Sequence, residues 1–447
     1  MKKIFKFGLV FLVLILVYNL LLFLSSLIPS QYLETKARES SETFLKQRNT
    51  FYVLDFYYVI NDNYTDSLMI NESVSIDSAN PVYSYMAARK NYKTGLTIEQ
   101  IAAPTGELKS ITSRPDGVYD TTLELSEFLA GKVTTSIEYA RYWHGYLVAL
   151  RPLLVFFNVT QIRIILLIVL IALLIPFTLL IKKRFGLLTA FIFAFSLFTI
   201  DYLFVSFSLQ GAPLFIVMMI SSIILLLRLD KIKNFYLYLF VVASISNFVD
   251  YLTVPLVTLG VPLLIYLLHL QKTDSEKTNK EFLKVIFLSC ISWGFGYGLT
   301  WISKWIIYDI IFHKHCLTTA LNQILYRSTG TPQIYSKKFS AVIIQFLLSN
   351  IMYVGIFCIQ IIAYTVFRFV LKGTRSISLN TNQISPRAKK GIPYLLVSLL
   401  PLLWYFVVQN HSSIHIYFTY RHMLIFVLGI LLFLKTVFCP SSDANNK

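Results

Sequence analysis

The sequence predicts an all-α polytopic membrane protein of about ten transmembrane helices, with a long extracytoplasmic loop of mixed structure after the first helix. Of the 447 residues, 56% are hydrophobic and 14% are charged, and the mean hydropathy is +0.63. A water-soluble domain needs more polar residues than this to cover its surface, whereas a bilayer removes that need. Long apolar runs recur along the chain, and the connections between them alternate in their content of Lys and Arg.

The apolar runs give the expected positions of the helices. A helix needs about 20 apolar residues to cross the hydrocarbon core of a bilayer. We expect membrane spans at residues 5–28, 162–181, 186–208, 212–229, 234–249, 253–270, 282–302, 340–369, 392–409 and 419–438. The first run follows Lys2, Lys3 and Lys6 and exceeds the roughly 7–15 apolar residues of a signal peptide, so we expect it to be retained as a helix.

The basic residues of the connections predict the orientation. If the N-terminus is cytoplasmic, the inner connections are 182–184, 228–233, 272–284 and 368–390, and all are rich in Lys or Arg. The outer connections 209–211 and 250–252 contain neither, as the positive-inside rule requires. We therefore expect a multi-pass protein of the cell membrane with both termini in the cytoplasm. One outer loop breaks the pattern, since it contains Lys304, Lys314, Arg327, Lys337 and Lys338.

Four regions follow from this topology. We expect a first transmembrane helix at 1–28, an extracytoplasmic loop subdomain with an interfacial end at 29–158, a transmembrane bundle at 159–438 and a cytoplasmic tail at 439–447. The loop subdomain mixes aromatic and β-branched stretches with turn signals and is long enough to be ordered.

Several classes of function are excluded by what the sequence lacks. The net charge of +17 does not indicate nucleic acid, because Lys and Arg stand largely at the ends of apolar runs. The four cysteines form no CxxC pair, which argues against a disulfide framework and a cysteine metal site. A Walker P-loop, a GxSxG motif and an HExxH motif are all absent from the sequence.

Two aspartates fall in or beside apolar runs, where a charge costs roughly 2.5–3.5 kcal/mol on insertion scales. We expect Asp250 to line an outer cavity or, alternatively, to cap a turn or helix. Asp201 falls inside the third run, where an interhelical hydrogen bond explains it as well as catalysis does.

A polar segment before the last run contains His411, His415 and Arg421. The histidines are four residues apart and share one face if the segment is helical. Such a pair can bind zinc, but no Glu stands beside it as in HExxH, so we expect no metal and keep a divalent ion as the alternative. Recognition of phosphate by these side chains is the commoner use. An ordinary polar interfacial loop is the remaining interpretation.

Basic and aromatic residues also gather where the first outer loop returns to the membrane, at Arg141, Trp143, His144 and Tyr146. Aromatic residues are typical of any membrane interface, but this does not account for Arg141 and His144. The combination suits binding of a lipid-linked phosphate or a sugar ring. Lys304 follows a similar string of Tyr, Gly and Trp residues at another outer helix end.

Asp66 is the candidate acid of the first outer loop. It follows Asp62 by four residues and precedes an apolar turn that would hold its carboxylate against the membrane surface. A solvated loop aspartate without a chemical role is the alternative.

Together these features resemble the GT-C superfamily of membrane glycosyltransferases. Three strings are similar to ones in bacterial membrane proteins of this type, namely 141–146 (RYWHGY), 250–255 (DYLTVP) and 411–421 (HSSIHIYFTYR). The resemblance covers most of the chain in architecture. It implies a sugar donor linked to polyprenyl phosphate, a cell-surface glycan or lipid-linked acceptor at the outer face, and a catalytic acid in the first outer loop. The acidic pair or DxD-like signature that such enzymes often show is not present here.

The resemblance also implies roles. Asp66 would be the general base, Arg421, His411 and Lys304 would neutralise the leaving lipid phosphate, and the aromatic residues of 141–146 would stack on the sugar. The alternatives are a transporter or flippase and a non-catalytic component of a polysaccharide assembly system. A transporter would need charged residues along a path through the bilayer.

Overall fold

The computed structural model describes residues 2–47, 50–54, 57–60, 62–92, 121–133, 135–274, 276–329 and 381–439. This part of the chain is mostly helical and contains six helical segments that are long and apolar enough to cross a membrane, as expected for an all-α membrane protein. The predicted span at 340–369 lies outside the described residues.

The long apolar segments contain the following helices: α1 (Lys2–Ser26), α8 (Val159–Phe185), α10 (Ala212–Arg228) with the short η3 (Leu229–Lys231), α13 (Asn279–Phe312), α17 (Thr381–Ser398) with α18 (Leu400–Val407), and α21 (Met423–Phe438). Four shorter apolar helices accompany them, namely α7 (Leu147–Phe156), α9 (Leu187–Phe198), α11 (Phe235–Val249) and α12 (Val257–Thr273). Many of their apolar side chains remain exposed in the isolated chain, as a lipid-facing surface requires.

One predicted span is not a continuous helix. The apolar run 186–208 forms α9, which ends at Phe198, and then the 3-10 helix η2 (Tyr202–Phe207). Between them Asp201 has a left-handed backbone with φ of 57°, which a right-handed helix cannot contain. Its carboxylate accepts a hydrogen bond from the Tyr420 hydroxyl at 2.6 Å, so this aspartate joins two distant segments. The interhelical hydrogen bond expected as one interpretation of Asp201 is therefore present.

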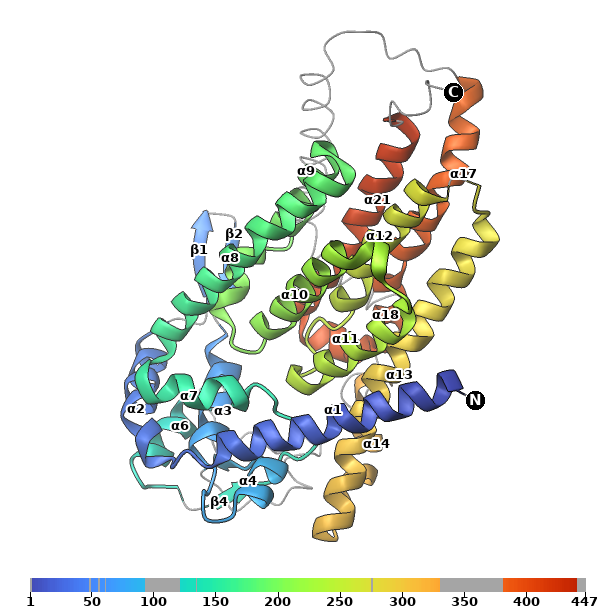
Figure 1. Ribbon diagram of the computed structural model, residues 1–447. Helices are drawn as coiled ribbons and strands as arrows, with labels where there is room; N and C mark the ends of the chain where they lie inside the picture. The colour runs from blue at the N-terminus through green and yellow to red at the C-terminus, as the bar shows by residue number, and fades with distance from the viewer. Residues whose placement is uncertain are drawn as a thin grey trace.

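The segment between α1 and α8 contains both helices and strands. Its helices are α2 (Gln31–Lys46), α3 (Asn63–Val74), α4 (Pro81–Ala87), α6 (Thr121–Leu129) and α7. Two antiparallel pairs accompany them, β1 (Thr50–Leu54) with β2 (Tyr57–Ile60) and β3 (Lys90–Tyr92) with β4 (Thr135–Ile137). Figure 1 shows the helices of this segment gathered at one end of the molecule, with α2 and α7 beside the start of α8, while β1 and β2 stand away from them.

Arg151 fixes this segment to α1. The side chain is fully buried in α7, and its guanidinium donates to the carbonyl oxygens of Ser25 at 3.1 Å and of Ile28, at the C-terminal end of α1. It also donates to the carbonyl oxygen of Ser73 in the last turn of α3. Helix C-termini leave carbonyl groups unpaired and carry a partial negative charge, so one arginine stabilises the ends of two helices.

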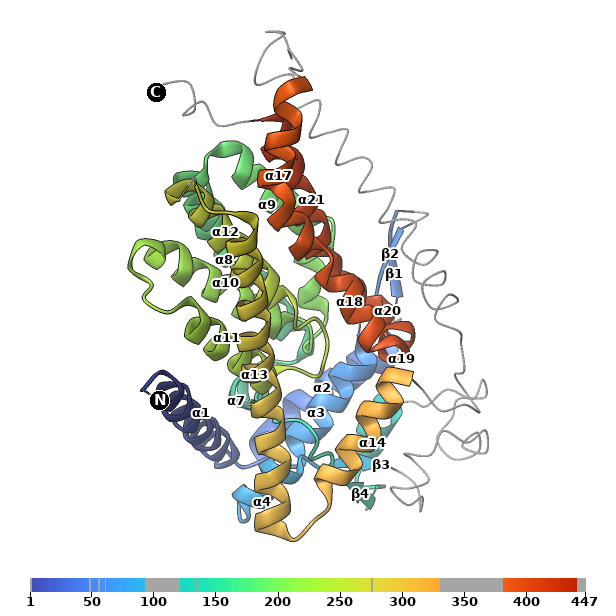
Figure 2. The same cartoon turned by 90° about the vertical axis from the view of Figure 1, so that its right-hand side faces the viewer.

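The C-terminal elements return to the same end of the molecule. After α13 the chain continues as α14 (Cys316–Thr329), and after α18 it forms α19 (Gln409–Ile414), α20 (Ile416–Thr419) and η4 (Tyr420–His422). Figure 2 shows α14 beside α19, where the two helices are in contact. Segments that are far apart in sequence therefore meet near the α1–α8 segment.

Candidate functional site

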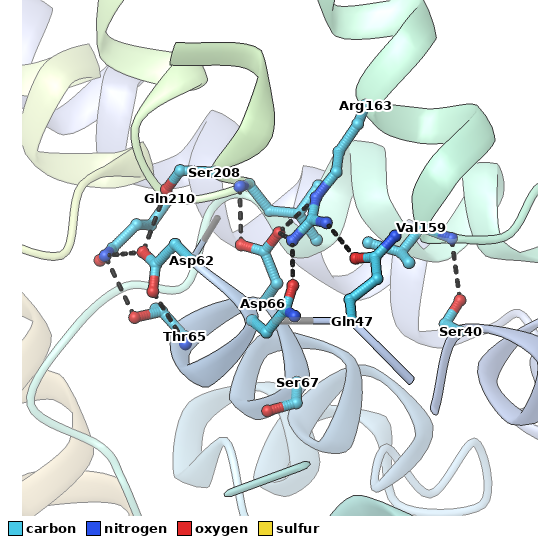
Figure 3. Close-up of polar contacts among 12 residues, drawn as sticks. Ser40, Gln47, Asp62, Thr65, Asp66, Ser67, Val159, Arg163, Ser208 and Gln210 are labelled. Carbon is cyan, nitrogen blue, oxygen red and sulfur yellow. Dashed lines mark hydrogen bonds and ion pairs between the residues drawn. The ribbon is translucent and has the colours of Figure 1, made fainter. Parts of the chain in front are cut away.

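The N-terminal end of α3 carries two carboxylates, shown in Figure 3. Asp62 is the N-cap residue, and its Oδ1 accepts from the backbone N–H of Thr65 at 3.2 Å. Its Oδ2 accepts from the Ser208 hydroxyl at 3.1 Å and from the Gln210 amide at 2.5 Å. All of these donors are neutral. Asp62 is 6% exposed, and Tyr64 beside it is 44% exposed, so this end of α3 reaches the surface.

Asp66 lies one turn further along α3 and is fully buried. Its Oδ2 accepts from Nε and Nη2 of Arg163 in α8, at 3.0 Å and 2.6 Å, and its Oδ1 accepts from the backbone N–H of Leu209 at 2.8 Å. Burial raises the pKa of Asp66 to about 7, while the charge of Arg163 lowers it. Both carboxylate oxygens are engaged, so in this arrangement Asp66 joins α3 to α8 and to the loop before α10.

A second polar cluster begins two turns along α3, at Glu72. Its Oε2 accepts from the hydroxyls of Tyr146 and Tyr251, and Nδ1 of His144 lies 3.2 Å away. The Nε2 atom of His144 donates to the carbonyl oxygen of Tyr139 at 2.8 Å. Burial and the charge of Glu72 hold the pKa values of both Tyr146 and Tyr251 well above 10. The four side chains of this cluster are all buried and interact closely.

Asp250 holds the loop between α11 and α12. Its Oδ1 accepts from the N–H and hydroxyl of Thr253, both at 2.8 Å, and its Oδ2 accepts from the Tyr297 hydroxyl at 2.7 Å. Burial raises the pKa of Asp250 to about 6. This is the geometry of the turn aspartate that formed the alternative for Asp250. The loop is strained, because Leu252 has φ of 65°.

Three distant parts of the chain meet at this loop. His144, from the end of the first long loop, has its Nδ1 2.9 Å from the Tyr251 hydroxyl. His411, from α19, donates with Nε2 to the carbonyl oxygen of Leu252 at 2.8 Å. The backbone N–H of Gly145 also donates to the carbonyl oxygen of Phe248 at 2.8 Å. His144 itself has φ of 56°, and backbone strain of this kind occurs preferentially at functional sites.

His411 of α19 and His415, the residue that follows this helix, lie together, with ring centroids 4.7 Å apart. Both nitrogens of His411 are occupied, since Nδ1 accepts from Nη1 of Arg327 at 2.5 Å while Nε2 binds Leu252. Burial and the charge of Arg327 hold the pKa of His411 well below its usual 6.5. No nitrogen of His411 is left for a metal ion, and the described residues contain no group of three or more His, Cys, Asp or Glu side chains suited to one.

Several predicted ligand residues are buried and already bonded. Lys304 is fully buried, donates to the carbonyl oxygen of Met86 at 2.7 Å and lies over the Trp143 ring at 5.6 Å. Trp143 is also fully buried and donates to the carbonyl oxygen of Thr300 at 2.6 Å. Arg421 donates to the carbonyl oxygen of Ile200 at 3.1 Å and is 7% exposed. A ligand could reach these groups only after rearrangement.

The structure therefore separates the predicted residues into two sets. One set meets around the α11–α12 loop and contains Trp143, His144, Tyr146, Asp250, Lys304, His411, His415 and Arg141. The other set consists of Asp66, which contacts α8, and Arg421, which contacts the segment before η2. Helix α3 links the two regions, because it carries both Asp66 and Glu72.

Three residues with central positions were not among the predicted site residues. Arg163 stands inside the predicted span 162–181, so the usual argument about charges in membrane spans would have found it. The sequence indicated Arg327 only as one of the basic residues of the outer loop that breaks the positive-inside pattern. Glu72 gave no signal, because α3 is buried on nearly all sides and has no amphipathic pattern.

Comparisons with family models, with curated proteins and with solved structures find no match to this chain.

Proposed function

We propose that the protein is a membrane glycosyltransferase that transfers a sugar from a polyprenyl-phosphate donor to a cell-surface glycan or lipid-linked acceptor on the outer face of the cell membrane. The observation that supports this best is the meeting of the three resembling strings: His144 and His411, from two of them, both contact the 250–252 segment of the third. Both termini would then be cytoplasmic, and the α1–α8 segment would stand outside.

The proposed general base is Asp62. The sequence favoured Asp66, but Asp66 is fully buried and its main partner is the Arg163 cation, which suits a residue that positions α3. Asp62 stands beside the exposed Tyr64, at the end of α3 that reaches the surface, and its donors among the described residues are the neutral groups of Thr65, Ser208 and Gln210.

The reaction would proceed in one displacement. The Asp62 carboxylate accepts the proton of the acceptor hydroxyl, and that oxygen forms a bond to C1 of the sugar. The bond between C1 and the phosphate oxygen breaks, and its electron pair leaves with the polyprenyl phosphate. Tyr64, which is 44% exposed, offers a more accessible ring to the sugar than Trp143 and Tyr146, which are buried.

The test is an assay of the full chain, purified in detergent, with a polyprenyl-phosphate sugar that is labelled in the lipid. Release of polyprenyl phosphate that requires an acceptor, and that is lost in Asp62→Asn, is the expected result. Failure to release it with any common donor sugar would contradict the proposal. In vesicles, movement of the intact labelled lipid across the bilayer without cleavage would favour the flippase alternative.

A further inference from the structure

The C-terminal third of the chain is unusual in its charge. Between Asp309 and Asp443 the sequence contains no Asp or Glu, while it contains Arg327, Arg421 and other basic residues. Any cation of this stretch must find its counter-charge elsewhere in the protein, in the membrane or in a ligand. Arg421 is bound to a backbone carbonyl and is nearly buried, whereas Arg327 in α14 is only half buried.

Arg327 is held in place by a neutral histidine. Its Nη1 donates to Nδ1 of His411, whose Nε2 donates to the carbonyl oxygen of Leu252. A guanidinium only donates and a carbonyl only accepts, so His411 must carry one proton, on Nε2. This contact orients the guanidinium without neutralising it. Through His411, Arg327 is thus connected to the strained α11–α12 loop.

Arg141 is held in a comparable way. The indole N–H groups of Trp301 and Trp305 in α13 both donate to its carbonyl oxygen, at 2.6 Å and 2.9 Å. The guanidinium carbon lies 4.9 Å from the centre of the Tyr139 ring, and the side chain is half buried. The backbone is fixed by two donors while the charged group rests on an aromatic face.

Both guanidinium groups act on the same tyrosine. Tyr142 follows Arg141 and packs against Trp301 and Tyr251. Burial raises the pKa of Tyr142 to about 12, the positive charges of Arg327 and Arg141 oppose this rise, and the more weakly felt charge of Asp250 adds to it. Within the described ranges neither arginine has a carboxylate within the 4.0 Å of an ion pair. Neither cation is therefore neutralised by a direct ion pair in this part of the chain.

We propose that Arg141 and Arg327 together bind the phosphate group of a ligand, with His415 at its edge. Planar guanidinium groups match tetrahedral phosphate oxygens with paired hydrogen bonds, which explains the use of two arginines rather than lysines. The identification of this phosphate with the head group of a prenyl-phosphate lipid rests on the proposed function. This pair would take the place of Arg421 and Lys304, which are occupied by backbone carbonyls.

The experiment measures binding of radiolabelled farnesyl phosphate to the full chain in detergent. We expect saturable binding that unlabelled farnesyl phosphate displaces and farnesol does not. Arg327→Gln and Arg141→Gln should each weaken binding on the order of tenfold to a hundredfold, as loss of a charge-assisted hydrogen bond predicts. Arg327→Lys, which keeps the charge but not the planar fork, should fall between wild type and Arg327→Gln.

Arg38→Gln is the matched control, because Arg38 is an exposed arginine of α2 whose one ion pair within the described residues is with Glu34. This variant should bind farnesyl phosphate like wild type. Displacement by millimolar inorganic phosphate would identify a free phosphate as the ligand, and displacement by phosphatidylglycerol would identify a phospholipid head group. Equal displacement by farnesol and farnesyl phosphate, or unchanged binding in both glutamine variants, would overturn the site. Binding through these arginines without any sugar transfer would retain the site and reject the glycosyltransferase.

Discussion

Nη2 of Arg163 lies 2.6 Å from Oδ2 of Asp66, and this buried ion pair joins α8 to α3. We expect Asp66→Asn to lower the free energy of unfolding by about 3–5 kcal/mol, because it leaves the guanidinium buried without its counter-charge. Melting temperatures in detergent measure this loss. The double variant Asp66→Asn, Arg163→Gln should recover part of it. If Asp66→Asn instead melts like wild type and loses only transfer activity, Asp66 is the base.

The variant Asp62→Asn tests whether the Asp62 carboxylate is needed for the reaction when the protein remains folded. Asn caps helices about as well as Asp, so the hydrogen bond to the Thr65 N–H should persist, and the melting temperature should fall only by the effect of the lost acceptor for Ser208 and Gln210. The variant removes the proposed proton acceptor, and kcat should fall by about 10²–10⁴-fold. Release of polyprenyl phosphate under saturating donor measures this. Near-normal kcat in a correctly folded Asp62→Asn protein would exclude Asp62 as the base.

Two glycines of α13 provide a matched pair of variants. A Cβ on Gly296 would lie 3.0 Å from the Cα of Phe240 in α11 and closer still to its carbonyl oxygen, whereas a Cβ on Gly298 would have no neighbour within 4 Å. Gly296→Ala should therefore destabilise the protein by about 1–3 kcal/mol. Gly298→Ala should be neutral or slightly stabilising, since Ala favours helix more than Gly. Equal melting temperatures for the two variants would show that α11 and α13 do not pack this closely.

His411 makes stability depend on pH. Its pKa is held well below 6.5 in the folded protein, so the folded form keeps the neutral imidazole while the unfolded chain takes up a proton. The stabilisation is complete above pH 6.5 and is lost as the pH falls, by up to about 1.4 kcal/mol per pH unit. Asp66 and Asp250, whose pKa values are raised, act in the opposite direction, so the test is the difference between wild type and His411→Asn. Between pH 7.5 and pH 5 the melting temperature of the wild type should fall relative to that of the variant, and a constant difference would contradict the buried neutral state.

The sequence predicted the helices whose signals are local. The helix α8 illustrates this, because a long apolar run is bounded by a capping box of Asn158 and Gln161 and by Lys182, Lys183 and Arg184 in its last turn. The coarser prediction of an all-α membrane protein is confirmed. The number of spans, their orientation and the extracytoplasmic position of the first loop remain predictions.

The features that the sequence did not predict depend on partners that are distant in the chain. The break at Asp201 follows from a hydrogen bond to Tyr420, more than 200 residues away in sequence, so no local pattern announces it. The burial of Trp143 and Lys304 likewise follows from contacts with α13 and Met86. Sequence patterns identified which polar strings deserve interest, but they did not distinguish side chains that hold the strings together from those that face a ligand.

The indole contacts of Arg141 have a spectroscopic consequence. Of the five tryptophans, Trp143, Trp293, Trp301 and Trp305 belong to α13 or to the segment packed against it, and only Trp404 lies elsewhere. Intrinsic fluorescence therefore reports mainly on one junction, without any added probe. Trp301 and Trp305 both donate to the Arg141 carbonyl oxygen. A shift in their emission would therefore report a small displacement of the backbone at Arg141 even while the helices remain packed.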